Sequence, residues 1–196
     1  DKHVTGVQTC ALPIFVLASG AAGWRDDPEA LLAAVILLDQ FSRNIHRGTP
    51  EAFAADPLAL ALTLEAIGKG WDRDLVPERA TFLYMPLMHA ESVEAQRMCL
   101  EKFTALGRAE NLRFAMEHAV VIEQFGRFPS RNAALGREST AEELEYLKRP
   151  EDRTTVVKGT IVDTRRPRDC ALTKTCIKPT HEVRSASCRA SVSISV

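Results

Sequence analysis

The sequence lacks any apolar run approaching the roughly 18 residues that a membrane-spanning helix needs. Neither sign of charge is in marked excess, because the chain has 25 Lys and Arg and 26 Asp and Glu. The resulting net charge of −1 gives no general attraction to nucleic acid or to an anionic membrane surface. It also lacks a nucleophile elbow, a phosphate-binding loop, a dinucleotide fingerprint and paired zinc ligands. We therefore expect no nucleic-acid partner and no membrane partner, and no motif by itself assigns a reaction.

Cysteine is scarce. Five cysteines in 196 residues are too few and too irregularly spaced for a disulfide framework. Cys170 and Cys176 are separated by five residues, which is not the tight spacing of a zinc knuckle. The sequence therefore predicts no metal site and no cofactor. Cys99 lies between Met98 and Leu100, which indicates a buried, small hydrophobic residue.

Aromatic residues are missing from the last part of the chain, since all twelve lie at or before Tyr146. Residues 151–196 carry nine Lys and Arg against five Asp and Glu, a net +4 that leaves −5 on the rest. A segment without aromatic and with few large apolar groups cannot offset its ordering entropy by burial. Residues 149–196 are therefore predicted to be a disordered or weakly structured tail, where residues 154–162 are compatible with a short hairpin.

The N-terminal segment, residues 1–23, is atypical. Lys2 and His3 followed by apolar residues 11–18 loosely imitate a signal peptide, although Pro13 interrupts the short apolar core. Residues 4–14 also resemble a translated sequencing adaptor of the kind found at the ends of metagenomic gene fragments. A signal-like leader and adaptor-derived sequence are both open hypotheses here, and an out-of-frame or fused origin is a parallel hypothesis for the tail. Resequencing the source DNA tests them, because a clean reading frame across both ends would reject the fused origin.

The middle of the chain, residues 24–148, has helical periodicity and no sustained period-two alternation. Caps and first-turn prolines predict helix starts near positions 28, 57, 78, 93, 112 and 141, and glycines predict stops near 68, 107 and 126. Asn111 is the cap expected for the fifth helix, and Thr140 with Glu143 forms a capping box for the last. Pro86 is expected to kink or end its helix. The pattern predicts one all-α domain, an antiparallel array of about six helices.

Two short polar segments, residues 40–44 and 124–132, follow apolar helical runs, and each carries an Arg-Asn pair. Asp39 and Arg43 lie one turn apart on one helix face. They either form an ion pair that locks the helix end, or Asp39 orients Arg43 toward a ligand anion. Asn44, at the helix end, is expected to cap the backbone.

The second segment and the residues that follow it carry three arginines within eleven residues, Arg127, Arg131 and Arg137, with one adjacent carboxylate. This region is therefore either a structural network or an anion site. Convergence of arginines from both segments in space would favour the anion site. The residues predicted to form it are Asp39, Gln40, Arg43, Asn44, Arg47, His89, Glu91, Arg127, Arg131, Asn132 and Arg137.

Two histidines are candidates for acid–base chemistry. His89 follows Pro86 and lies two residues before Glu91. It either acts as a general acid or base beside that carboxylate, or bonds a backbone carbonyl exposed at the proline. His118 shares an apolar helix face with Phe114 and Ile122, which favours a core histidine.

The order of these motifs resembles a known family. The resemblance rests on residues 38–44 with Arg47 and Gly48, and on residues 56–60, 89–91, 125–132 and 135–140. Over about residues 24–148 the chain is similar to the bacterial family of unknown function numbered 924. This resemblance implies an all-α, TPR-like fold and a cytoplasmic protein, and it brings no established activity.

The chain departs from the family pattern in three places. Ser42 stands where proline is usual, and Ser130 stands where histidine is usual, which removes an acid–base candidate from that loop. Members also carry a helical segment before the position of Trp24, which residues 1–23 do not match. A truncated first helix is therefore expected to expose the face formed by Leu31 and its neighbours and to favour self-association.

Two classes of function stay open. One is a site for a small anionic ligand, a carboxylate or phosphate, bound through the arginines. The other is a TPR-like scaffold that binds a peptide or partner protein, with purely structural Arg and Asn motifs. A deep pocket lined by arginines would favour the first class, and an open apolar face would favour the second.

Overall fold

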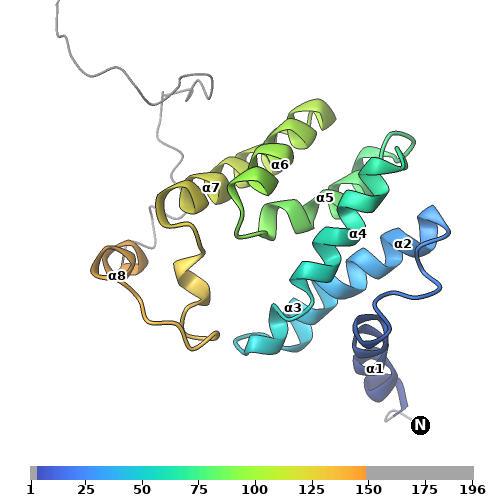
Figure 1. Cartoon of the computed structure of the whole chain (residues 1–196), viewed down its shortest axis with the longest axis horizontal. Helices are drawn as coiled ribbons and strands as arrows, with labels where there is room; N and C mark the ends of the chain where they lie inside the picture. The colour runs from blue at the N-terminus through green and yellow to red at the C-terminus, as the bar shows by residue number, and fades with distance from the viewer. Residues whose placement is uncertain (1–3, 149–196) are drawn as a thin grey trace, which may run out of the picture. The chain divides into compact units, whose positions relative to one another are not determined.

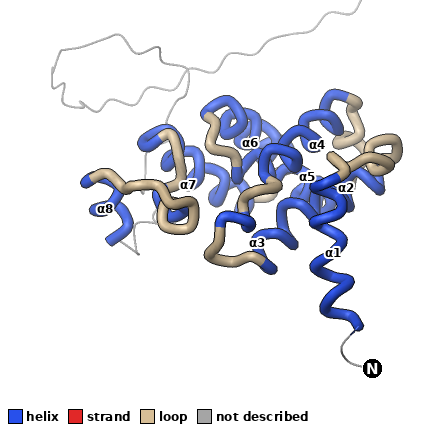
Figure 2. The backbone as a smooth tube through the Cα atoms, turned by 60° about the horizontal axis from the view of Figure 1, so that its bottom comes forward, coloured by secondary structure: helices blue, strands red, loops and turns tan. Residues whose placement is uncertain are grey.

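The computed structural model describes residues 4–148, and every regular element in that range is helical (Figures 1 and 2). The helices are α1 (Val4–Ala18), α2 (Pro28–Ile36), α3 (Ser42–Ile45), α4 (Asp56–Gly68), α5 (Pro77–His89), α6 (Val93–Leu106), α7 (Ala109–Phe125) and α8 (Ala141–Lys148). A π-helical turn, Leu37–Phe41, joins α2 and α3. The all-α prediction is confirmed, while the predictions for the tail at 149–196 and the hairpin at 154–162 lie outside the described residues.

The helix ends follow the local chemistry of the sequence. The Asp27 carboxylate accepts the Ala30 N–H at 2.8 Å and begins α2. Gly107 and Gly126 end α6 and α7 in the left-handed region, with φ of 70° and 71°, which glycine adopts without steric cost. The Thr140 capping box forms as expected, because Glu143 N–H donates to the Thr140 hydroxyl and Thr140 N–H donates to the Glu143 carboxylate.

One boundary differs from the sequence prediction. Helix α7 begins at Ala109 after Arg108, so Asn111 lies inside the first turn and the expected cap is wrong. Of the two outcomes expected at Pro86, a kink or an end, the helix does not end there, because α5 continues through Pro86 as far as His89. Pro86 is buried, and packing of the surrounding side chains holds the helix although its ring removes one backbone hydrogen bond.

The core is formed where consecutive helices pack on one another. α6 and α7 are joined by two residues and run side by side, α5 packs on α6, and α2 packs on α4 and α5 (Figure 1). Phe103, Leu62, Leu83 and Leu87 are each at most 1% exposed within this core. Helix pairs of this kind are compatible with the TPR-like arrangement implied by the family resemblance.

Helix α1 covers the face that the sequence predicted to be exposed. Leu31, Val35 and Leu38 are each at most 1% exposed, and Val16 of α1 belongs to the same buried cluster. The expectation of an exposed face is therefore wrong, because the apolar N-terminal segment folds as a helix against the π-helical turn. Because these side chains are buried, this face is not open for the self-association that the sequence led us to expect. Within residues 4–148, no helix combines the length and apolarity that would let it cross a membrane.

Candidate functional site: a buried polar cluster beside an open pocket

The site begins at the π-helical turn that follows α2. Asp39 lies within this turn and is 1% exposed. Its carboxylate is therefore buried next in sequence to Leu38, in a segment whose other buried side chains, such as Val35, are apolar. π-Helical turns are rare and frequently occur at functional sites, because the extra residue shifts the phase of the helix that follows. The Gln40 side-chain amide donates to Asp39 Oδ2, and Arg43, one turn on, contacts Asp39 Oδ1 at 3.2 Å.

His89, at the end of α5, is the third partner of Asp39. Its Nδ1 lies 2.7 Å from Asp39 Oδ1, and Arg43 Nε donates toward the same Nδ1 at 3.3 Å. The shorter distance indicates that Nδ1 donates to the carboxylate. Burial raises the pKa of Asp39, but the hydrogen bond with His89 and the positive charge of Arg43 act in the opposite direction, and this pKa lies below its usual value. The ring partner of His89 is thus a carboxylate fifty positions away in sequence, neither Glu91 nor a backbone carbonyl.

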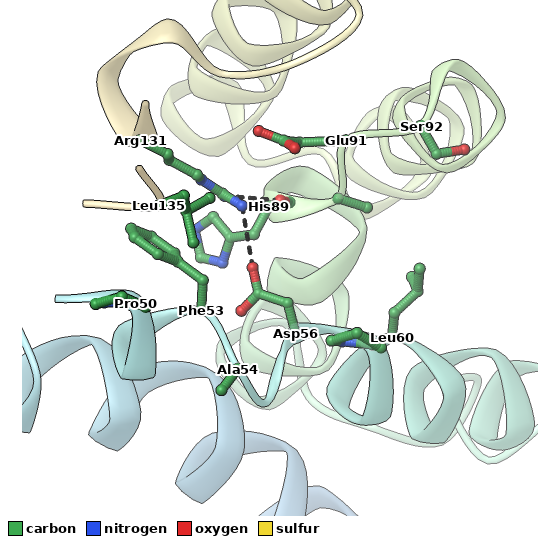
Figure 3. Close-up of a pocket in the computed structure, with 12 residues that line it drawn as sticks. Pro50, Phe53, Ala54, Asp56, Leu60, His89, Glu91, Ser92, Arg131 and Leu135 are labelled. Atoms are coloured by element: carbon green, nitrogen blue, oxygen red, sulfur yellow. Dashed lines mark hydrogen bonds and ion pairs between the residues drawn. The ribbon is translucent and has the colours of Figure 1, made fainter. Parts of the chain in front are cut away.

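Asp56, at the start of α4, joins the two polar segments. Arg43 Nη2 donates to Asp56 Oδ1 at 2.9 Å, and Arg131 Nη1 donates to Asp56 Oδ2 at 3.1 Å. Arg131 Nη2 also donates to the His89 carbonyl at 2.7 Å, as the dashed lines in Figure 3 show. The structure therefore brings Arg43 and Arg131 together, but Arg47 and Arg127 do not join them. We call Asp39, Arg43, Asp56, His89 and Arg131 the central cluster.

The charges of the central cluster are paired with one another and are largely removed from water. Two arginines stand against two carboxylates, and each of their side chains is less than one-fifth exposed. Burial raises the pKa of Asp56 despite the neighbouring Arg43 and Arg131, and burial lowers the pKa of Arg131 despite Asp56. Desolvation therefore outweighs the mutual attraction at this pair.

The central cluster borders a pocket of about 400 Å³. Phe53, Leu60 and Leu135 contribute apolar walls, and Asp56, His89 and Arg131 contribute charged or polar groups (Figure 3). The Arg131 guanidinium lies 4.8 Å from the Phe53 ring centroid and 4.5 Å from that of Phe128, so this cation lies over two aromatic rings. A small molecule with an apolar body and a charged end fits these linings.

Arg137 pairs with Glu91, a carboxylate that also lines the pocket. The arginine donates two parallel hydrogen bonds, at 2.8 and 2.9 Å, to the two Glu91 carboxylate oxygens. The Phe128 N–H also donates to Glu91 Oε1 at 2.8 Å, which fixes the loop after α7 on the chain that follows α5. Both predicted site residues are therefore occupied in holding Phe128 in place.

Arg127 and Asn132 attach α8. Arg127 donates to both Glu143 carboxylate oxygens at 2.6 and 2.8 Å, and the Asn132 amide donates to Glu143 at 3.2 Å. These hydrogen bonds, led by the one from Arg127, lower the pKa of Glu143 to about 2. The remaining predicted residues lie at the exposed end of α3, where Asn44 donates to the Gln40 carbonyl and Arg47 donates to Asn44.

The second histidine lies close to the first but in a different setting. His118 Nδ1 lies 2.8 Å from the Phe114 carbonyl, and its ring centroid is 6.1 Å from that of His89. Burial lowers the pKa of His118, as expected of a core histidine. Ser130 is exposed and lines a smaller pocket of about 120 Å³ beside His118, so the position without the family histidine lies apart from the central cluster.

Sequence reasoning missed three parts of this site. The sequence marks Asp56 as a helix start and as part of a family motif, and Phe128 as part of another such motif, but it assigns neither of them, nor Phe53, to the site. A carboxylate facing two arginines from distant segments cannot be found from local spacing, because the pairing depends on how α4 packs against α2. Within residues 4–148 there is no group of three or more His, Cys, Asp or Glu side chains that could hold a metal ion.

The fold and site define an all-helical protein with a charge-balanced polar cluster at the junction of its helices. Residues 13–151 match the bacterial family of proteins of unknown function DUF924, and the chain belongs to that family. The match begins eleven residues earlier than the motifs indicated, so part of α1 belongs to the family pattern. A solved structure of a protein of unknown function from Agrobacterium tumefaciens is 42% identical, with a TM-score of 0.65 over 68% of this chain and 76% of that one. Among curated proteins, none matches.

Proposed function

We propose that the pocket beside the central cluster binds a small molecule that carries a carboxylate or phosphate, with Arg131 as its main anion contact. The observation that carries this proposal is the position of Arg131, the predicted-site arginine that lines the 400 Å³ pocket. Its recorded hydrogen bonds to Asp56 and His89 use two of five N–H donors. A planar guanidinium with donors to spare suits a carboxylate or phosphate.

The pocket walls favour an anion with an apolar body over a bare inorganic ion. Phe53, Leu60 and Leu135 offer apolar surface next to Arg131. Burial of that surface adds to affinity in proportion to the area removed from water. We therefore expect phenyl phosphate and phenylacetate to bind more tightly than inorganic phosphate.

Thermal shift tests this proposal. At ten times its Kd, a ligand that binds only the folded state stabilises it by about 1.4 kcal/mol. For a chain of this size that corresponds to a rise in Tm of roughly 3–5 °C. Phenyl phosphate should raise the Tm of the wild type and leave that of Arg131→Ala unchanged. Arg47→Ala is the matched control, because it removes an exposed arginine outside the pocket, and its shift should equal that of the wild type.

Two results would count against the proposal. One is an unchanged Tm with all three anions. The other is an equal shift in wild type and Arg131→Ala, because the ligand would then bind elsewhere on the chain.

The scaffold alternative needs an apolar face open to a partner. Exposed large apolar side chains occur on α1, where Leu12, Ile14, Phe15 and Leu17 are 36–63% exposed, and on α7, where Met116 and Val120 are 39% and 58% exposed. Exposed apolar side chains do not by themselves identify a partner, so this alternative stays a prediction.

A further inference from the structure

We propose that His89, oriented by Asp39, is a general base, so that the pocket is catalytic and its anionic occupant is a substrate. This inference rests on the proposed function, because the substrate is the carboxylate or phosphate compound that Arg131 holds. The base would remove a proton from an O–H group, either on that compound or on a water molecule bound beside it.

The first argument is the tautomer that the geometry imposes on His89. A neutral imidazole carries one N–H, and Nδ1 has two contacts: the Asp39 carboxylate at 2.7 Å, and Arg43 Nε, which points its N–H at Nδ1 at 3.3 Å. The shorter contact, with an ionised carboxylate, favours the hydrogen on Nδ1. Nε2 then keeps its lone pair and is the basic atom. Asp39 is suited to this role because it is buried and is held in the ionised form by Gln40 and Arg43 as well as by His89.

The second argument is that the imidazole is held rigidly and still reaches the pocket. The His89 side chain is 18% exposed and lines the pocket, where it lies beside Arg131, Phe53 and Asp56 (Figure 3). Its backbone is fixed as well, since Arg131 binds the His89 carbonyl and the Gln96 amide donates to the Met88 and Ala90 carbonyls at 2.7 and 2.9 Å. A base pre-positioned in this way needs little reorganisation when it acts.

The third argument is that the charges fit a proton transfer. The O–H bond breaks, its electron pair stays on oxygen, and the Nε2 lone pair forms the new N–H bond. The resulting imidazolium is stabilised by Asp39, and the oxygen anion is stabilised by Arg131. The charged or titratable groups that surround His89 are Asp39, Arg43, Asp56 and Arg131, with His118 as its neighbouring ring.

The decisive measurement is the tautomer of His89 by long-range ¹H–¹⁵N NMR on the wild-type chain without ligand. We expect a protonated Nδ1 and an unprotonated Nε2. A neutral His89 that carries its hydrogen on Nε2 would overturn the proposal, whatever anions bind in the thermal shift experiment.

A chemical measurement tests the reactivity of Nε2. Diethyl pyrocarbonate should modify His89 at least tenfold more slowly in Asp39→Asn than in wild type, because the amide favours the other tautomer. Asp39→Glu should restore at least part of the rate, which loss of packing alone would not produce. His46, outside the central cluster, is the internal control and should react at the same rate in all three chains. Equal rates at His89 in wild type and Asp39→Asn would overturn the role of Asp39.

Ligand protection separates this proposal from the proposed function. Phenyl phosphate should protect His89, but not His46, from diethyl pyrocarbonate. A raised Tm without protection of His89 would overturn the general base and leave the anion site standing. An unchanged Tm would overturn the anion site itself.

Discussion

At the scale of single residues, Asp56 has two opposing effects. Its carboxylate forms ion pairs with both Arg43 and Arg131, and so connects α3 with the loop after α7. The same carboxylate occupies Arg131, the residue that a ligand anion needs. Asp56 therefore stabilises the fold while it competes with a ligand for the guanidinium.

Asp56→Asn separates these two effects. We expect a loss of about 1–3 kcal/mol in the free energy of unfolding, less than the 3–5 kcal/mol for fully buried pairs, because Asp56 is 18% exposed. The Tm shift with phenyl phosphate should grow, because Arg131 is released. Chemical denaturation and thermal shift measure the two quantities. Exposed Asp74→Asn, the control, should stay within about 0.5 kcal/mol of the wild type. A smaller ligand shift in Asp56→Asn would show that Asp56 helps the ligand to bind.

At the scale of elements, α8 depends on a few charged hydrogen bonds. It has eight residues, which is too short for a stable isolated helix in water. Glu143 is 2% exposed and receives hydrogen bonds from Arg127, Asn132 and the Thr140 N–H. The Phe125 and Tyr146 rings, 5.2 Å apart between centroids, also attach α8, so part of its attachment depends on the ionised state of one carboxylate.

The stability from this attachment should depend on pH. The pKa of Glu143 falls from 4.5 to about 2 on folding, chiefly through its hydrogen bond with Arg127. A carboxyl with a lowered folded pKa stabilises the fold above 4.5, and the effect is lost as the pH falls toward 2. Glu143→Gln should therefore lower the Tm at pH 7, and the difference from the wild type should shrink between pH 4.5 and pH 2. Exposed Glu123→Gln should show no such convergence. A difference that is constant across this range would exclude the ionised carboxylate as the cause.

At the scale of the whole molecule, stability comes from helix pairs that share one core. Phe103 is fully buried in α6 and contacts Tyr84 of α5 edge to face, with 5.9 Å between ring centroids. Phe103→Ala should lower the free energy of unfolding by about 3–5 kcal/mol, because it removes buried apolar surface and leaves a cavity. Val120→Ala, at an exposed site on α7, should change it by less than about 0.5 kcal/mol. Urea denaturation measures both, and a loss below 1 kcal/mol in Phe103→Ala would show that the helices repack around the missing ring.

Local signals predicted most of the helices. Prolines, caps and glycines act within a few residues, so the positions of α4, α6 and α7 could be read from spacing. The same reasoning failed at α1, because the covering of Leu31 and Val35 by Val16 depends on packing between distant segments. It also failed to place Asp56 in the candidate site, because its two partners, Arg43 and Arg131, come from two distant parts of the chain.

By itself, the sequence determined that residues 24–148 fold as helices and that arginines gather at their ends, since both follow from side chains a few positions apart. Only the tertiary structure decided what each arginine does. Arg127 pairs with Glu143 and Arg137 pairs with Glu91, whereas Arg131 reaches a pocket beside His89. The physical reason is that the pairing of a buried charge depends on which helices meet, and that is set by how the apolar faces pack together.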